Sequence, residues 1–372
     1  MRRYDSSSDE DDIRVRPGRR GSRPRTRTRP KHEDAAFGHV LTIDRGRLTC
    51  LVDGREVVAM KARELGRKGV VVGDQVALVG DLSGDEGTLA RIVRVEPRAS
   101  TLRRTADDDD PFERVIVANA DQLAIVIALA DPEPRPRLID RCLVAAYDAG
   151  LEPLLVLTKA DLAPAKPLLD VYAPLGVRHV VTAHGLDSGT GWDAEDGAVP
   201  DGEATGGEAA EEDGRVTEAG MRALLRGRVT VFVGHSGVGK TTLVNALVPG
   251  RARATGRVNA VTGRGRHTTT SALALPLAEE AERAGAPGDP EGAGWVIDTP
   301  GVRSFGLAHI DPSRVIHAFP DLEEGTADCP RACSHDEPDC ALDAWVAEGH
   351  ADPARLHSLR RLLASRERRE GD

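Results

Sequence analysis

The sequence predicts a multidomain α/β protein with a small β-barrel first, a parallel-sheet domain in the middle and a short helical module last. The chain has 372 residues, which exceeds the usual size of one domain. Short alternating strands fill residues 36–100, whereas longer apolar runs separated by helix-like segments fill residues 101–310. Three of the five cysteines lie close together after residue 311.

Residues 1–35 are charged, rich in Pro and Gly and almost without apolar side chains. We expect this arm to be disordered because it cannot bury enough surface to fold. Residues 13–31 are rich in Arg and contain no acid, which is typical of segments that neutralise nucleic-acid phosphates. A solvated tail without a ligand has the same composition, so both interpretations stay open.

Five short segments with β-type alternation and Gly or Asp turns follow in residues 36–100. They are GHVLTI, RLTCLVDG, REVVAMK, VVVGDQVALVG and TLARIVRVE. This pattern predicts a five-stranded barrel of the oligonucleotide-binding (OB) type. Such barrels often bind nucleic acid, but only 3% of the residues are aromatic and available for base stacking. A barrel that serves packing alone is the alternative.

After a polar linker, STLRRTADDDDPFER, the pattern changes to that of a parallel sheet. QLAIVIALA and EPLLVLTKAD are continuous apolar strands, and RLIDRCLVAAYDAG between them predicts a helix. VRHVVTAHG, RVTVFVG, TSALALPL and WVIDTPG add further strands. An acidic insert at 185–214 interrupts the domain, and its charge alone equals the net charge of the chain, −10. The overall acidity therefore does not exclude an RNA partner.

GHSGVGKT, at 234–241, matches the P-loop pattern and lies between a strand and a helix, as that motif requires. Backbone amides of the loop would hold phosphate oxygens, Lys240 would reach the β- and γ-phosphates, and Thr241 would ligate Mg²⁺. The loop residues predicted to contact the nucleotide are Gly234, His235, Ser236, Gly237, Val238, Gly239, Lys240, Thr241 and Thr242.

Two further motifs end apolar strands, DTPG and TKAD. Asp298 of DTPG would hold Mg²⁺, and the Gly301 amide would meet a γ-phosphate. In TKAD, the Asp161 carboxylate would accept two hydrogen bonds that guanine donates and adenine does not. A buried Asp161 left unpaired costs free energy, so this residue would favour GTP over ATP. We expect Lys159 to lie along the base and Thr158 to tie this loop to the P-loop.

CPRACSHDEPDC places Cys329, Cys333, His335 and Cys340 within a short segment, which supplies enough ligands for a tetrahedral zinc site. The four ligands leave no vacant position, so the zinc would be structural. Scattered free cysteines are the alternative. The two other cysteines are isolated, and the total is odd, so the pattern does not indicate a secreted disulfide framework.

With Thr182-Ala183 and a switch segment at 265–270, these motifs follow the order TKAD, Thr-Ala, P-loop, switch and DTPG, whereas an unpermuted GTPase begins with the P-loop. Chain order is free to change because the carboxyl ends of the strands bring the loops together. With GRHTTT (265–270), DTPGVRSFGL (298–307), ANADQ (118–122) and the cysteine cluster, the chain resembles the ribosome small-subunit-dependent GTPase A family over about residues 37–365.

The resemblance implies a circularly permuted P-loop GTPase domain at 101–310, after an OB-type barrel at 36–100 and before a helical zinc-binding module at 311–372. It implies a GTP hydrolase that binds GTP and GDP and the nearly mature 30S ribosomal subunit with its 16S rRNA. Hydrolysis of GTP on the subunit would help late maturation and the release of other assembly factors.

The resemblance also indicates site residues. Val302 stands where Ras-like GTPases have a water-orienting Gln, so His267 of the GRHTTT switch is the candidate catalytic residue, together with Lys240. An exposed loop histidine is the alternative. One of the threonines in 268–270 would sense Mg²⁺ and the γ-phosphate. Thr182 and Ala183 would supply a backbone amide to guanine O6.

Two other classes of protein stay open. Val302 favours a guanine-nucleotide-switched RNA-binding protein without significant hydrolysis, and the P-loop alone admits an ATP-using kinase, against which TKAD argues. No segment reaches about eighteen unbroken apolar residues, and the N-terminus lacks the apolar centre of a signal peptide. We expect a cytoplasmic monomer without a membrane partner, holding one structural zinc per chain and Mg²⁺ with GTP.

Overall fold

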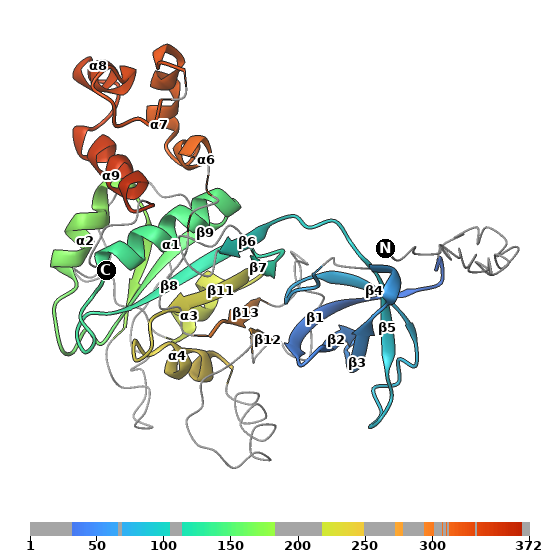
Figure 1. Ribbon diagram of the computed structural model, residues 1–372. Helices are drawn as coiled ribbons and strands as arrows, with labels where there is room; N and C mark the ends of the chain where they lie inside the picture. The colour runs from blue at the N-terminus through green and yellow to red at the C-terminus, as the bar shows by residue number, and fades with distance from the viewer. Residues whose placement is uncertain are drawn as a thin grey trace, which may run out of the picture. The chain divides into compact units, whose positions relative to one another are not determined.

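The computed structural model describes residues 32–65, 69–104, 114–182, 218–248, 272–277, 294–300, 307, 310, 312–331 and 333–366 (Figure 1). Contacts divide the chain into two units, Met1–Glu33 and Asp34–Asp372, and every element named below belongs to the second. The predicted arm as far as residue 31 and the acidic insert lie outside the described residues.

Five strands in the described part of the second unit close into a barrel. They are β1 (Ala36–Asp44), β2 (Arg47–Val52), β3 (Arg55–Lys61), β4 (Gln75–Gly80) and β5 (Ala90–Val95), with a short 3₁₀ helix, η1 (Arg63–Leu65), after β3. They pair in the circuit β1-β2-β3-β5-β4-β1, in which only the β3–β5 pairing is parallel. Alternate side chains, such as Val40, Val57 and Leu78, fill the interior. This arrangement confirms the predicted OB-like barrel.

The segment that we expected to be a polar linker is in part a β-hairpin. The first part of the predicted linker forms β6 (Thr101–Arg104), and its last residue begins β7 (Arg114–Ala118), which pairs antiparallel with β6; the residues between them lie outside the described part. The prediction was wrong for β6 because its one buried side chain, Leu102, gives no alternation among its charged neighbours. The apolar residues of β7, 115–118, lie beyond the predicted linker.

Six strands of the middle domain form one sheet in the order β10-β9-β8-β11-β13-β12. They are β8 (Gln122–Ala128), β9 (Glu152–Thr158), β10 (Arg178–Val181), β11 (Val229–Gly234), β12 (Leu273–Pro276) and β13 (Trp295–Asp298). All pairings are parallel except that of β12 with β13. β12 also pairs with β1, at Leu273 and Thr42, so the sheet continues into the barrel.

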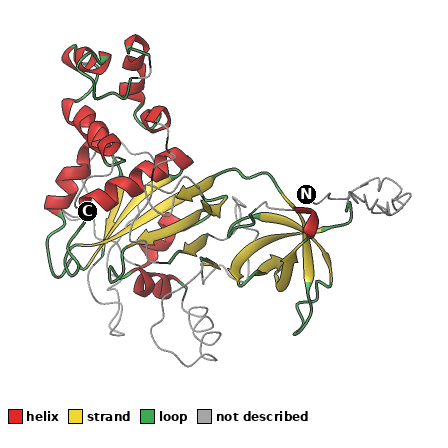
Figure 2. Cartoon of the chain, viewed as in Figure 1, coloured by secondary structure: helices red, strands yellow, loops and turns green. Residues whose placement is uncertain are grey.

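Helices cover both faces of this sheet (Figure 2). The helices are α1 (Pro136–Ala149), α2 (Lys166–Tyr172), η2 (Ala173–Leu175), α3 (Glu218–Leu225) and α4 (Lys240–Leu247). Ile125 of β8 belongs to the apolar core on the α1 side, and its neighbour Val126 belongs to the core beneath α3 and α4. Burial on both faces explains why the strands are continuous apolar runs rather than alternating ones.

Short helices make up the C-terminal part. They are α6 (Pro312–Ile316), α7 (Pro320–Glu323), η5 (Glu324–Asp328), α8 (Ala341–Ala347) and α9 (Pro353–Ala364). α9 lies against α1, where Arg141 Nη1 donates to the Ser365 carbonyl at 2.8 Å and Arg361 pairs with buried Asp140 at 3.3 Å. Within the described ranges, no helix has the length and apolar character that crossing a membrane requires.

Candidate functional site

The predicted nucleotide motifs meet at one edge of the central sheet. The P-loop follows β11, TKAD follows β9 and DTPG begins at the end of β13. β8 separates β9 from β11, and β13 is the other neighbour of β11. Parallel strands direct their carboxyl ends to the same edge, so these loops assemble whatever their order in the chain. A base-reading motif therefore functions equally well before or after the P-loop.

The P-loop turns from β11 into α4 in a conformation suited to phosphate. Gly237 and Gly239 have φ angles of +87° and +88°, which residues with side chains adopt only with strain. Gly239 is the N-cap of α4, so the first backbone amides of the helix have no partner inside it. Ser236 is exposed, and the His235 ring contacts the Ser236 carbonyl at 2.9 Å.

Lys240, predicted to contact phosphate, and Asp298, predicted to hold Mg²⁺, are direct neighbours at this edge. Lys240 Nζ donates to Asp298 Oδ1 at 2.6 Å and also to the Thr299 carbonyl. Both side chains are almost fully buried. The Thr299 hydroxyl donates in turn to the Phe232 carbonyl of β11 at 2.7 Å, which fixes DTPG beside the P-loop strand. Thr241 is exposed in the first turn of α4 and Thr242 is half-buried.

Thr158 connects TKAD to the P-loop. Its hydroxyl lies 2.6 Å from the Val238 carbonyl, a short hydrogen bond between residues that are buried and far apart in the sequence. This contact is the link between the TKAD loop and the P-loop that the sequence predicts. Lys159 has a φ of +59°, and its ammonium donates to the Asp131 carbonyl in the loop after β8.

The Asp161 side chain is exposed, whereas the predicted selectivity for guanine requires a buried carboxylate. Its burial would have to come from the bound base itself. Thr182 is buried after β10 and links that strand to the same loop, since its amide donates to the Leu157 carbonyl at 2.7 Å and its carbonyl accepts from the Ala160 amide at 3.1 Å.

Several predicted groups lie outside the described residues: His267, the threonines at 268–270, Ala183, Gly301 and Val302. Their roles stay predictions. The structure adds one feature that the sequence does not indicate, an apolar pocket beside the P-loop. The end of β8, the loop 132–135, the start of α1 and Gly234, His235 and Val238 line it. No local pattern signals such a pocket because it depends on how distant segments pack.

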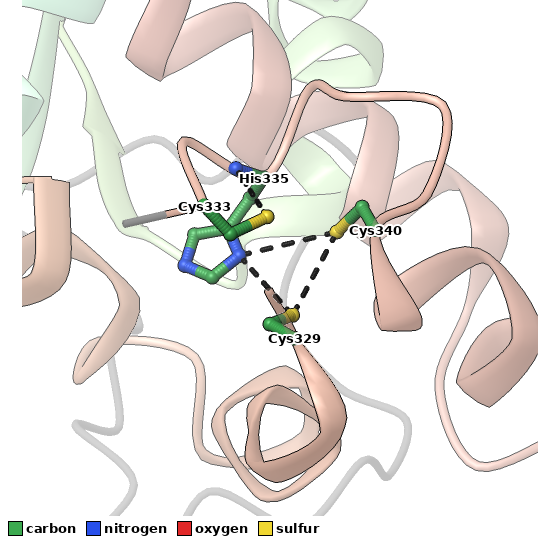
Figure 3. Close-up of side chains that lie close together, drawn as sticks. All are labelled: Cys329, Cys333, His335 and Cys340. Atoms are coloured by element: carbon green, nitrogen blue, oxygen red, sulfur yellow. Dashed lines mark hydrogen bonds between the residues drawn. The ribbon is translucent and has the colours of Figure 1, made fainter. Parts of the chain in front are cut away.

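The cysteine cluster converges on one point (Figure 3). The ligand atoms of Cys329, Cys333, His335 and Cys340 all lie within 4.8 Å of one another. Cys329 Sγ is 3.9 Å from Cys340 Sγ and 3.8 Å from His335 Nδ1. A tetrahedral zinc ion with Zn–S bonds of about 2.3 Å holds its sulfur ligands about 3.8 Å apart. The four residues therefore fit a metal ion of this kind.

The surroundings of the cluster suit metal binding. Arg360 of α9 donates to the His335 carbonyl at 2.7 Å, and His335 has a φ of +69°, so its backbone is held in an unusual conformation. Burial lowers the pKa of His335, with Glu337 opposing and Arg360 adding to the shift, which favours the neutral imidazole that metals bind. Burial raises the pKa of Cys333 to about 12 and also raises that of Cys340, so metal binding would release protons.

Comparison with known proteins agrees with this geometry. Residues 95–190 and 209–308 match the family described as RsgA GTPase. A protein of Pseudomonas aeruginosa (strain LESB58), named small ribosomal subunit biogenesis GTPase RsgA, is 37% identical over 304 residues, which cover 80% of this chain and 76% of the relative.

Two solved structures have a similar fold. YjeQ from Thermotoga maritima has a TM-score of 0.55 and 23% identity, covering 90% of this chain and 99% of that one. YloQ, described as a circularly permuted GTPase, has a TM-score of 0.54 and 18% identity, covering 91% and 98%. At these identities the two likenesses concern the fold alone.

Proposed function

This chain belongs to the RsgA GTPase family and hydrolyses GTP, and we propose that it binds the 30S ribosomal subunit, which stimulates the hydrolysis. The reaction would serve late maturation of the small subunit and the release of other assembly factors. The relatives' names place them in small-subunit biogenesis. The nucleotide site in this proposal rests on the direct contact of the P-loop with TKAD, through Thr158, and with DTPG, through Lys240 and Asp298. The role of the subunit rests on the family.

In the proposed site, the amides of the P-loop hold the phosphates, and Lys240 contacts the β- and γ-phosphates. Thr241 and Asp298 hold the Mg²⁺ that accompanies the nucleotide and neutralises charge on the phosphates as the bond breaks. Lys240 and Asp298 now pair with each other at 2.6 Å. We expect this pair to separate when GTP and Mg²⁺ bind, because each side chain then faces a more highly charged partner.

The base would be read on the other side of the P-loop. Asp161 accepts two hydrogen bonds from guanine, Lys159 lies along the ring, and the backbone of Thr182 and Ala183 faces O6. Support for this placement comes from the hydrogen bonds that hold Thr158 and Thr182 to the adjoining strands and the P-loop. The proposal predicts GTP and GDP as ligands, with ATP bound much more weakly.

His267 would orient the attacking water, since Val302 cannot. The variant His267→Ala should keep GTP affinity and lose stimulated turnover. His179→Ala, at an exposed histidine on β10, is the matched control and should leave both unchanged. If His267→Ala turns over normally on the subunit, the role belongs to another residue.

We further propose that Cys329, Cys333, His335 and Cys340 hold one zinc ion, which stabilises the C-terminal module and takes no part in the chemistry. The arm and the barrel would contact 16S rRNA. The protein would act as a cytoplasmic monomer. These proposals rest on the cluster geometry, the Arg-rich arm and the family.

The first test is phosphate release from GTP and from ATP by the purified protein, alone and with purified 30S or 50S subunits. We expect 30S subunits, but not 50S subunits, to stimulate GTP turnover strongly. ATP turnover should stay near background with either subunit. Basal GTP turnover that 30S does not change would overturn the proposed stimulation. ATP turnover equal to that of GTP would overturn the assignment of Asp161.

A further inference from the structure

The ANADQ motif, residues 118–122, takes no part in the nucleotide site. It lies at the amino ends of the strands, between β7 and β8, whereas the nucleotide loops follow the carboxyl ends. Asn119 has a φ of +55°, a conformation that Asn tolerates better than most residues. A motif with an unusual backbone so far from the chemistry needs its own explanation.

Asn119 joins three segments through its backbone and both ends of its carboxamide. Nδ2 donates to the Gly73 carbonyl at 2.9 Å, in the loop before β4 of the barrel. Oδ1 accepts from the Ala99 amide at 2.8 Å, and the Asn119 amide donates to the Ser100 carbonyl at 3.0 Å. One side chain therefore holds both the barrel and the connector that leaves it.

The barrel fits closely against this motif. A Cβ on Gly73 would lie only 2.1 Å from the Ala118 carbonyl oxygen, and Gly73 has a φ of +87°, so only glycine fits there. The Ala118 amide donates to the Val72 carbonyl at 3.0 Å. Backbone thus meets backbone at the joint, without an intervening layer of side chains.

An ion pair fixes the same loop of the barrel. Asp74 is fully buried, and Arg98 of the connector reaches it through Nε at 2.6 Å and Nη2 at 2.8 Å. The Val71 amide also donates to Asp74, at 2.7 Å. Two-pronged pairing of a buried carboxylate sets direction as well as distance.

The other end of the motif is anchored in the nucleotide domain. Asp121 exchanges hydrogen bonds with Val229, through its amide at 2.9 Å and through Oδ2 at 2.7 Å, and its carbonyl accepts from the Glu152 amide at 2.9 Å. The start of β8 is therefore tied to the starts of β11 and β9. The motif links the barrel rigidly to the amino edge of the sheet.

We infer that Asn119 is a positioning residue for subunit-stimulated hydrolysis. It holds the barrel and the nucleotide domain in one orientation, so that both can contact the same large partner. Binding then does not pay the entropic cost of fixing the two domains relative to each other. The inference rests on the proposed 30S stimulation. Because the nucleotide loops lie at the opposite edge of the sheet, hydrolysis without the subunit does not depend on this joint.

The variant Asn119→Asp tests the inference with a change of few atoms. The carboxylate still accepts from the Ala99 amide but places an oxygen, instead of a donor, against the Gly73 carbonyl. Asn119→Gly is the second variant, because glycine accepts the positive φ and removes both side-chain bonds. Asn245→Asp, at an exposed asparagine on α4, is the matched control.

Phosphate release is measured without subunits and across a titration of 30S. We expect both Asn119 variants to keep basal turnover and GTP affinity, while the 30S concentration for half-maximal stimulation rises at least about fivefold. Asn245→Asp should match the unmodified protein in every measurement. A change confined to the 30S midpoint separates positioning from a role in folding, which would lower basal turnover too.

The outcomes are distinct. If the unmodified protein is stimulated and the Asn119 variants respond to 30S identically, the inference is overturned and the proposed function stands. Loss of basal turnover in both variants also overturns it. If 30S stimulates neither the unmodified protein nor any variant, the proposed function fails, and the inference fails with it.

Discussion

The barrel and the cysteine region at 329–347 reach their folds by different means. Every barrel strand pairs with two others, and alternate residues build a closed apolar core. The cysteine region follows η5 and ends with α8, helices of five and seven residues, which are too short to be stable alone. From 320 to 347, excluding residue 332, the buried apolar side chains are Leu322, Cys340 and Leu342.

The two regions are stabilised by different interactions. In the barrel it is distributed over a ladder of backbone bonds and many small apolar contacts, so no single ligand is needed. In the cysteine region a few side chains must gather around one point, which is what a metal ion accomplishes. Metal removal should therefore destabilise the cysteine region and leave the barrel unchanged.

Removal of the proposed zinc ion should change hydrogen exchange more than any substitution below. Chelation, or the variant Cys340→Ser, should expose the amides of α8 to hydrogen exchange while β2 and β3 stay protected. A structural zinc site contributes about 10–16 kcal/mol of binding free energy. The packing of two short helices cannot compensate for the loss of this free energy. Metal content per chain and exchange measured by mass spectrometry check this. Equal protection of α8 with and without metal would contradict the comparison.

Two glycine substitutions come next. A Cβ on Gly325 would lie 2.5 Å from the Trp345 ring, and one on Gly38 would lie 2.7 Å from Val52 and 2.8 Å from the Leu51 carbonyl. Each change to Ala should cost about 1–3 kcal/mol. Gly38→Ala should lower the urea midpoint of the barrel, and Gly325→Ala should affect exchange only near α8.

Gly69→Ala is the control for both variants, since nothing lies within 4 Å of a Cβ there. A fall in barrel stability in the Gly325→Ala protein would show that the two regions unfold together. That result would remove the contrast between them.

Thr158→Val changes a residue that lies outside both regions. Val lacks the hydroxyl that bonds the buried Val238 carbonyl at 2.6 Å, so GTP affinity should fall by about 1–2 kcal/mol, roughly five- to thirtyfold. Titration calorimetry measures the loss. Hydrogen exchange in the barrel and in α8 should not change, and a change in either would mean that the nucleotide loops support it.

The smallest effect concerns exposed ion pairs. The Arg360 hydrogen bond lowers the pKa of Asp343, so this pair stabilises α8 against α9 fully above the ordinary aspartate pKa and less as pH falls through the lowered value. Asp343→Asn should cost about 0.2–1 kcal/mol, constant between about pH 5 and 8. Glu96→Gln, which breaks the Arg94 pair of the barrel, is the counterpart. A loss that varies across this pH range would contradict the assignment.

The sequence predicted the elements whose pattern is local. The barrel strands alternate because one face is buried, and β8, β9 and β11 are continuous because both faces are. The P-loop, TKAD and the cysteine cluster were visible because their chemistry is set by residues close together in the chain. The circular permutation followed from their order, and the family from the wider set of motifs, and both were confirmed.

Other features depend on segments that meet only in the fold. The hairpin β6–β7 depends on pairing between segments that lie apart in the chain. Helix α3 was not predicted, although its buried residues Met221 and Leu225 have helical spacing. The contact between Lys240 and Asp298 joins two motifs that were predicted separately. The exposure of Asp161 also escaped prediction, because burial of a loop side chain depends on what packs beside it.

The order of the motifs also determines which segment precedes the C-terminal module. In this permuted order DTPG is the last nucleotide motif, so the chain continues from Asp298 to α6 and the helices around the cysteine cluster. Leu307 and Ile310, on that path, are buried in the core shared with α1. The segment that would sense the γ-phosphate is thus the covalent lead into the C-terminal module, an adjacency that an unpermuted GTPase would place in the middle of its domain.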